Sequence, residues 1–284
     1  TSAVIDTFME KDSRVRVIKN PANLGISESL NRLLLEAKSE FIARMDADDI
    51  CAPNRLEKQY HYMKSRDLDI CGCWIQYKGG FPATVRFPVS DRELRLYMLF
   101  RPPFAHPSVM FRKSGLEGLT YRNIPDLPED YDLWTRLPDH LKLGNIPERL
   151  LYYRRHVSQI TGKNRKWVTQ PAREPYLRRH HPWVTDQQVA THLKLRSSDK
   201  LDIGELADIR DWLTVLASKY SGNEECLDIL RDEWFYAAGC ASTHGIKTWN
   251  IYRSAGQLGY GATAHIKVIF LWVACFLGIT YIQI

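Results

Sequence analysis

The stretch FIARMDADDICAPNRLEKQ, residues 41–59, joins a short apolar segment directly to three acids, Asp46, Asp48 and Asp49. Carboxylates crowded at a strand end repel one another and lose hydration, and a fold tolerates them where a cation or a polar ligand lies among them. An Asp-x-Asp motif in that position offers hard oxygen ligands to Mg²⁺ or Mn²⁺, which in turn hold a diphosphate. The structural alternative is a turn in which one Asp caps the helix that begins near Pro53. The placement at a strand end favours the functional interpretation.

Around this motif, segments of strand character alternate with segments of helical character. Expected strands cover residues 14–20, 41–46, 68–77 and 108–111, and expected helices cover residues 26–40, with Ser27 as N-cap, and 53–66, with Pro53 in the first turn. This alternation predicts an α/β fold with a mostly parallel sheet covered by helices. Ligands of such sheets gather at the carboxyl ends of the strands, which is where the three acids fall.

The alternation stops near Gly162, and the segments 208–220, 223–239 and 265–276 have helical patterns. We therefore predict two parts, residues 1–162 and a helical C-terminal region, residues 163–284. The run from Val268 to Ile284 is uncharged and at the lower limit of length for a bilayer span. It either contacts a membrane, by spanning it or by lying on its surface, or forms a buried helix.

Composition narrows the class of protein less than the motifs do. With 44% hydrophobic and 25% charged residues, the chain is an ordinary globular protein. The formal charge of +6 suits an acidic small molecule, nucleic acid or an anionic membrane surface. No known nucleic-acid reader motif is present, so nucleic acid is not an expected partner. The six cysteines form no C-x-x-C pair, which indicates buried thiols in a reducing compartment.

A second acidic group, Glu129 and Asp130, lies in PEDYDLWTRL at an expected helix start. The helix dipole favours acids there whatever their function, and the functional alternative is a general base held at a site mouth. Tyr131 and Trp134 either line an acceptor pocket or belong to the core.

Three further features are candidates for ligand contacts. His156 follows Arg154 and Arg155 in a segment suited to phosphate, and it could complete a metal site with the Asp-x-Asp motif. The turn NPANLG, residues 20–25, with Asn31 downstream, could approach a nucleotide through its backbone amides. For His106 a structural role is expected.

The order of five segments resembles the family 2 glycosyltransferases with the GT-A fold. These segments are NPANLGISESLN, FIARMDADDICAPNRLEKQ, HPSVMFRK, PEDYDLWTRL and LLYYRRHVSQIT, and they extend from about Arg14 to about Thr161. The resemblance implies transfer of a sugar, with inversion, from a nucleotide-diphosphate sugar, commonly a UDP-sugar. The acceptor would be a hydroxyl of a glycan or a lipid-linked glycan in bacterial surface polysaccharide biosynthesis, at the cytoplasmic face of the plasma membrane.

The resemblance also assigns roles to individual residues. It implies that Asp130 is the catalytic base beside Glu129, and that Asp48 and His156 bind the divalent metal, Mn²⁺ or Mg²⁺. The implied donor contacts are Asn23, Gly25, Asn31, Asp46, Arg154 and Arg155, and the implied acceptor contacts are Tyr131 and Trp134.

Two departures from the family pattern stand out. Family members usually begin with a strand and an Asp-Gly-Ser segment, and this sequence begins after that point, so residues 1–162 are expected to form a GT-A domain without its first strand. Leu30 also replaces an Arg that often precedes the Asn of the following helix. An inactive binding module of the same fold is therefore an alternative. A metal-dependent phosphohydrolase is a weaker one, because a further set of ligands for a second metal is missing.

Overall fold

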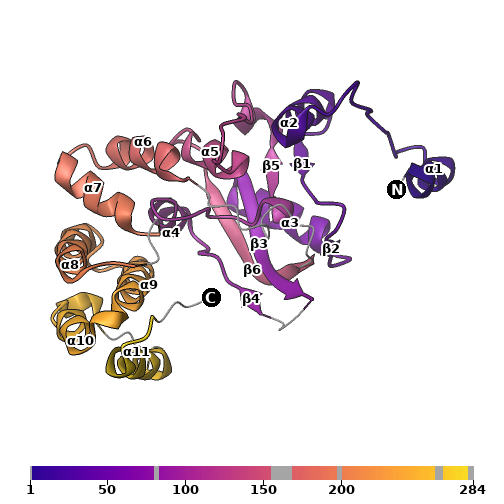
Figure 1. The fold of residues 1–284 in the computed structure, drawn as a ribbon. Helices are drawn as coiled ribbons and strands as arrows, with labels where there is room; N and C mark the ends of the chain where they lie inside the picture. Colours follow the sequence, from indigo (N-terminus) through magenta and orange to yellow (C-terminus); the bar gives the residue numbers. More distant parts are fainter. Residues whose placement is uncertain (1, 80–82, 155–167, 197–199, 260–264, 281–284) are drawn as a thin grey trace.

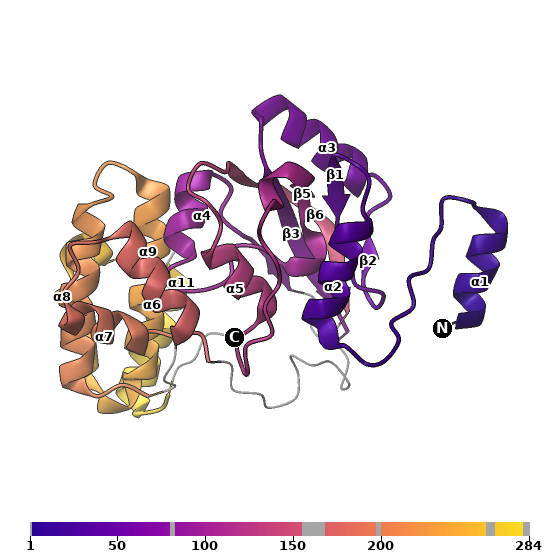
Figure 2. The same ribbon diagram turned by 90° about the horizontal axis from the view of Figure 1, so that it is seen from above.

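The computed structural model describes residues 2–79, 83–154, 168–196, 200–259 and 265–280. A twisted sheet with its covering helices forms one part of the molecule, and the helices α6 to α11 gather on one side of it (Figures 1 and 2). Helix α1 (Ser2–Lys11) stands apart on the opposite side and is joined to the rest by an extended segment. The predicted α/β fold with a helical C-terminal region is confirmed.

The sheet is mixed, so the prediction of a mostly parallel sheet is wrong. Its strands are β1 (Phe41–Ala43), β2 (Ile50–Cys51), β3 (Ile70–Lys78), β4 (Thr84–Val85), β5 (Met110–Arg112) and β6 (Leu143–Arg154). Their order is β1-β5-β3-β6-β2, with β4 paired to β3. Among these described strands β3 and β6 pair in parallel, and the other four pairings are antiparallel.

The strand directions explain both the success and the error of the parallel prediction. Strands β1 and β3 are both antiparallel to β5, so β1, β3 and β6 run in one direction, as a strand–helix–strand alternation requires. Strand β5 follows a short 3₁₀ turn, His106–Ser108, and runs the opposite way. The start of β5 therefore lies at the same edge of the sheet as the end of β1, where Ala43 pairs with Met110.

The helices of this part are α2 (Gly25–Glu36), α3 (Arg55–Arg66), α4 (Asp91–Tyr97) and α5 (Glu129–Thr135). Helix α2 begins at Gly25, whose φ of 75° favours glycine, and Ser27 is not its N-cap. The Ser27 hydroxyl instead donates to the Arg122 carbonyl. Pro53 lies in the turn before α3 rather than in its first helical turn.

The strand expected at residues 14–20 does not form. These residues are irregular, and Val17 is exposed. A strand needs a neighbour for its backbone N–H and C=O groups, and none of the described strands runs beside this segment.

The helical region contains α6 (Gln170–His180), α7 (Asp186–Lys194), α8 (Ile203–Ser218), α9 (Glu224–Cys240), α10 (Ile246–Arg253) and α11 (His265–Leu277). Helices α7, α8 and α9 start on capping residues that the sequence supplies. Thr185 and Gln188 form a capping box on α7, and Asp202 and Glu205 form one on α8.

The core is continuous between the sheet and the C-terminal helices. One buried hydrophobic cluster includes Ile70 of β3, Trp134 of α5 and Leu271 of α11. Arg173 of α6 is fully buried and donates to the carbonyls of Leu99, His192 and Leu195. The boundary predicted near Gly162 falls in residues 155–167, outside the described residues.

Within the described part of the chain, none of the helices combines the length and the apolar character that crossing a bilayer requires.

Candidate active site

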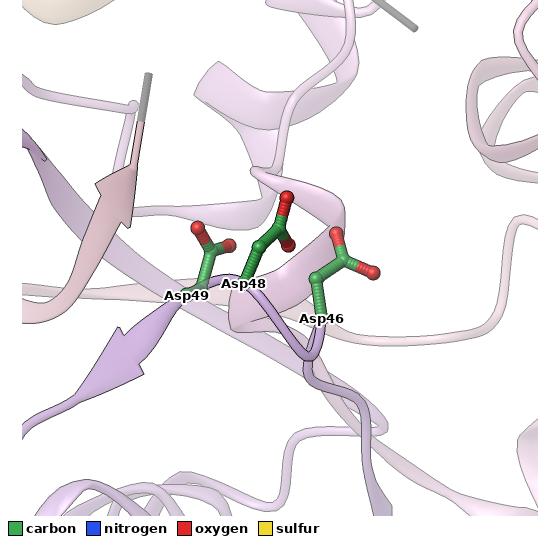
Figure 3. A group of neighbouring side chains, drawn as sticks. All are labelled: Asp46, Asp48 and Asp49. Carbon is green, nitrogen blue, oxygen red and sulfur yellow. The ribbon is translucent and has the colours of Figure 1, made fainter. Parts of the chain in front are cut away.

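The three acids of the motif lie in a turn between β1 and β2, and their side chains rise from it next to one another (Figure 3). The Asp49 N–H donates to the Asp46 carbonyl and closes the turn. Each carboxylate offers an oxygen within 4.8 Å of an oxygen of the other two. Asp46 is half-buried, Asp48 is exposed and Asp49 is buried. The alternative role, an Asp that caps α3, is not formed, because the N-cap position is Asn54.

Asp49 carries the clearest sign of electrostatic strain in this turn. One of its oxygens, Oδ1, accepts a hydrogen bond from the Arg154 backbone N–H at 3.0 Å, so the carboxyl end of β6 meets the turn. The other, Oδ2, is buried with no hydrogen-bond partner. Burial raises the Asp49 pKa to about 6, and the charges of Asp46 and Asp48 add to this effect against the Arg154 N–H.

Arg44 neutralises part of this negative charge, and the sequence analysis overlooked it. Its guanidinium binds Asp46 through two contacts, Nη2–Oδ1 at 2.6 Å and Nη1–Oδ2 at 2.7 Å. Such paired contacts fix the carboxylate in orientation as well as in charge. The available signal was an Arg two residues before the first acid of the motif, at the end of an apolar strand.

Two buried side chains of helix α3 hold the acidic turn in place. The buried guanidinium of Arg55 donates to the carbonyl of Arg44 at 3.0 Å and to that of Pro107 at 2.7 Å. Gln59, also buried, donates to the carbonyls of Cys71 and Ser108. The end of β1 and the 3₁₀ turn before β5 are thereby fixed relative to each other.

A second group of polar side chains forms where α5 begins. His106 Nε2 lies 2.9 Å from the Tyr121 hydroxyl, and His106 Nδ1 lies 3.7 Å from Glu129 Oε1. Asp130 follows Glu129 and accepts the Tyr131 N–H on its Oδ1. His106 therefore contacts a proposed catalytic residue, a role beyond the structural one that its place before a strand suggested.

The two neighbouring acids have pKa shifts of opposite sign. Burial raises the Asp130 pKa, and the adjacent Glu129 charge raises it further, against the opposing effects of His106 and Arg44. Burial raises the Glu129 pKa, but the interaction with the nearby His106 and the Arg44 charge outweigh it, so the Glu129 pKa is lowered. Pairs of carboxyl groups separated in this way divide acid–base roles at many active sites.

Arg44 connects the two acidic groups electrostatically. Its charge acts on Asp49 in the turn and on Glu129 and Asp130 at α5, as well as on the Tyr121 hydroxyl between them. Arg44 therefore lies near both acidic groups, at the carboxyl end of β1.

The structure does not support the predicted acceptor contacts. The side chains of Tyr131 and Trp134 are fully buried. The Tyr131 hydroxyl donates to the Met98 carbonyl, and the Trp134 ring packs edge-on against Phe104. Both are core residues, because α5 turns this face towards Met98 and Phe104.

Some of the predicted donor contacts have other partners. The side-chain amide of Asn31 exchanges two hydrogen bonds with the Tyr121 backbone and anchors that loop to α2, and its role as a nucleotide contact stays a prediction. Asn23 is exposed, and its side chain accepts the Gly25 N–H at the start of α2. This arrangement does not test whether Asn23 or Gly25 contacts a nucleotide sugar, so that role stays a prediction.

Two predicted ligands, Arg155 and His156, lie outside the described residues. Arg154 ends β6 with an exposed side chain beside the acidic turn. The residues present fit a divalent cation without them: three carboxylates offer oxygens at close range, and the buried Asp49 Oδ2 lacks a partner. A cation would offset the repulsion that raises the Asp49 pKa.

Comparison with known proteins gives the class of this chain. Residues 1–117 match the family described as glycosyl transferase family 2. The O-antigen biosynthesis glycosyltransferase WbnJ of Escherichia coli is 35% identical over 158 residues, which cover 52% of this chain and 60% of WbnJ. Over these residues the chain is similar to glycosyl transferase family 2.

Two further comparisons show similar sequence and a similar fold. The UDP-Gal:alpha-D-GlcNAc-diphosphoundecaprenol beta-1,3-galactosyltransferase of E. coli is 30% identical over 148 residues, covering 50% of this chain and 53% of the enzyme. The crystal structure of S. aureus TarS 1-349 superposes with a TM-score of 0.51 at 11% identity, covering 98% of this chain and 77% of that one, and shows a shared fold. The chain spans little more than half the length of the curated relatives it matches.

Proposed function

We propose that this protein is an inverting glycosyltransferase that transfers a sugar from a nucleotide-diphosphate sugar to a hydroxyl of a glycan or lipid-linked acceptor. The observation that carries the proposal is that Arg55 holds the backbone of Arg44, which binds Asp46, beside that of Pro107, whose neighbour His106 lies against Glu129. The acidic turn is suited to the donor diphosphate and the acid pair at α5 to the acceptor hydroxyl.

The acidic turn forms the donor side of the site. Asp48 and Asp49 would hold a divalent cation, Mn²⁺ or Mg²⁺, which when bound neutralises the charge that develops on a departing diphosphate. Asp46 is already held by Arg44 and is suited to the donor ribose or its neighbourhood. The Arg154 side chain extends from the adjacent end of β6, where it can bind a phosphate oxygen.

Asp130 is the proposed general base. A carboxyl group with a raised pKa is a stronger base once ionised, and it accepts the proton of the acceptor hydroxyl as that oxygen attacks. Proton transfer of this kind contributes a factor of about 10²–10⁴ to the rate. Inversion needs one base on the side of the sugar opposite the leaving group, as inverting glycoside hydrolysis does. Burial keeps the Asp130 pKa high, and the charge of the neighbouring Glu129 adds to this effect.

The donor and the pathway are proposed from the relatives. A UDP-sugar donor is supported by the name of the galactosyltransferase, and surface polysaccharide biosynthesis by that of the O-antigen enzyme. A lipid-linked acceptor would place the reaction at the cytoplasmic face of the plasma membrane. Asn23 and Gly25 remain proposed nucleoside contacts, and His156 and Arg155 remain proposed contacts of the metal and the diphosphate.

Turnover of UDP-sugars with Mn²⁺ tests the proposal. Asp48→Ala should abolish metal-dependent donor binding, whereas Asp130→Asn should keep donor binding and lose transfer. Asp186→Asn, at a side chain that is 93% exposed on α7, is the matched control and should behave like the parent. Binding without turnover in the parent, unchanged in Asp130→Asn, would show an inactive binding module. Phosphate release without any sugar acceptor would show a phosphohydrolase instead.

A further inference from the structure

Helix α11 has two apolar faces that differ completely in their surroundings. One face, with Val268, Leu271 and Cys275, is buried against α9, α10 and the turn Ser242–His244. The opposite face is exposed although its side chains are large and apolar, namely Ile269, Phe270, Trp272, Phe276 and Leu277, followed by Ile279 just after the helix. Soluble proteins rarely leave such a continuous patch uncovered without a binding function.

The exposed residues form one continuous surface, which we call the α11 face. Their spacing, 269, 272 and 276 and then 270 and 277, follows successive helical turns on the side away from the core. The rings of Trp272 and Phe276 stack with their centroids 5.6 Å apart. Ile246, at the start of α10, is 66% exposed. It lies next to the C-terminal end of α11, because the preceding residue, Gly245, lies against the Cys275 carbonyl. Figure 1 shows α11 at the outer edge of the helical region.

The charged residues in the last part of the sequence, which contains α10 and α11, are all basic. From Trp234 to Ile284 the sequence contains no Asp or Glu, and it contains Lys247, Arg253 and Lys267. Lys267 lies at the first turn of α11 and Lys247 next to Ile246, so the two lysines flank opposite ends of the patch. An acid does lie beside the α11 face: Asp232 of α9, whose Oδ1 is 3.7 Å from the Lys267 ammonium.

We propose that the α11 face docks on an anionic lipid surface, with its apolar side chains between the headgroups and the two lysines against lipid phosphates. Exposed Trp, Phe and Leu on one side of a helix, with Lys at the borders and no acids in α10 or α11 themselves, is the chemistry of an interfacial helix. The opposite face is committed to the protein core, so α11 lies along the membrane surface rather than across it. The inference does not rest on the transfer reaction.

Flotation with liposomes tests this docking surface. The parent should float with vesicles that contain phosphatidylglycerol and bind more weakly to pure phosphatidylcholine, with added salt reducing the difference. Phe270→Ser combined with Phe276→Ser should lower vesicle binding about tenfold, because two apolar anchors are lost. Both side chains are more than half exposed, so the thermal unfolding temperature should stay close to that of the parent.

The controls separate this inference from its alternatives. Phe8→Ser combined with Leu35→Ser removes the same kind of exposed side chain on α1 and α2, and it should bind vesicles like the parent. Asp130→Asn, which loses transfer under the proposed function, should also bind vesicles normally. Lys247→Gln combined with Lys267→Gln should weaken binding to anionic vesicles alone.

Three results would overturn the inference. The first is a parent that does not float with anionic vesicles, and the second is equal binding by the phenylalanine variant. The third is a dimer of the parent, seen by light scattering, that disappears in the phenylalanine variant, because the α11 face would then be an interface between two copies.

Discussion

At the scale of single residues, the protonation states of the acids in the candidate site depend on burial and on neighbouring charges. Glu129 and Asp130 are neighbours in the sequence, yet His106 and Arg44 keep the first ionised while burial beside that charge raises the pKa of the second. The same principle applies to Asp49, whose raised pKa reflects burial beside two other acids.

The pH dependence of transfer should report the raised Asp130 pKa. The rate should fall as the pH drops through that pKa, since the protonated carboxyl group cannot accept a proton. Glu129→Gln removes the neighbouring negative charge and so lowers the Asp130 pKa, which should move the acidic limb to lower pH. The measurement is the profile of kcat/KM between about pH 4 and pH 9. A limb that stays in place or moves upward would argue against Asp130 as the base.

Replacing Arg55 tests how the acidic turn is held. Arg55→Met leaves the buried carbonyls of Arg44 and Pro107 without their donor, and each such group costs about 1–3 kcal/mol. The free energy of unfolding, measured in urea, should fall by about 2–4 kcal/mol. Arg14→Lys, at a side chain that is 89% exposed, should change it by less than about 0.5 kcal/mol. A stable Arg55→Met variant with normal metal binding would contradict this role.

At the scale of elements, hydrogen bonds from side chains, more than backbone pairing over long strands, fix β1 and β2 in place. β1 has three residues and β2 has two, so their backbone pairing alone is weak. Arg55 and Gln59 of α3 add four hydrogen bonds to the loops and strands at this edge. The acidic turn is thereby held on a rigid support, as a preorganised site requires.

The close approach of β3 to β6 at Gly72 gives a prediction at this scale. A Cβ at position 72 would lie 2.2 Å from Asn145 Oδ1 and 2.8 Å from Phe104 Cδ1. The Asn145 amide cannot easily move away, since it donates to the carbonyls of Pro88 and Pro103. Gly72→Ala should therefore lower the free energy of unfolding by about 1–3 kcal/mol, measured by urea denaturation.

Gly144→Ala is the matched control on the neighbouring strand β6. Its Cβ would meet Leu68 Cδ1 at 2.6 Å, the end of a flexible side chain that can rotate away. The loss of stability should be smaller than for Gly72→Ala. An equal loss in the two variants would mean that Asn145 is not the rigid partner in this contact.

At the scale of the whole molecule, a buried ion network joins the C-terminal helices to the sheet. Glu233 of α9 is fully buried and binds Arg101, after α4, at 2.8 Å and Arg196, after α7, at 2.7 Å. Burial opposes its ionisation, but the two guanidinium charges prevail and lower its pKa. The network therefore couples the position of α9 to that of α4 beside the sheet.

Removing the Glu233 carboxylate should weaken the connection between the C-terminal helices and the sheet part of the molecule. Glu233→Ala leaves two guanidinium groups without their counter-charge, so the free energy of unfolding at neutral pH should fall by about 3–5 kcal/mol. Because its folded-state pKa is lowered, Glu233 stabilises the fold above its ordinary pKa, and this contribution is lost as the pH falls through the folded-state value. The parent should thus lose stability on acidification, and the variant should lose less of it. Parallel pH curves of thermal unfolding for the two proteins would contradict this account.

Sequence patterns predicted the local elements well and their partners poorly. Helices α2 and α3 and strands β1 and β3 follow from apolar periodicity and turn residues, and they form close to the predicted positions. The segment 14–20 has the same alternating character but remains irregular, because a strand also requires a neighbour. The mixed direction of the sheet likewise depends on β5, whose reversal has no local signal.

The sequence by itself determined the crowding of negative charge in the acidic turn. The Asp-x-Asp motif at a strand end favours a cation or a polar ligand because of the repulsion between its charges, and that repulsion is a local property of residues 46–49. Tertiary structure alone decided the rest. Arg44, His106 and Tyr121 meet the acids through the pairing of β1 with β5, whereas Tyr131 and Trp134 turn inward because α5 packs against Met98 and Phe104. Burial and the distance between charges separated in the chain set these roles, and no local pattern encodes either quantity.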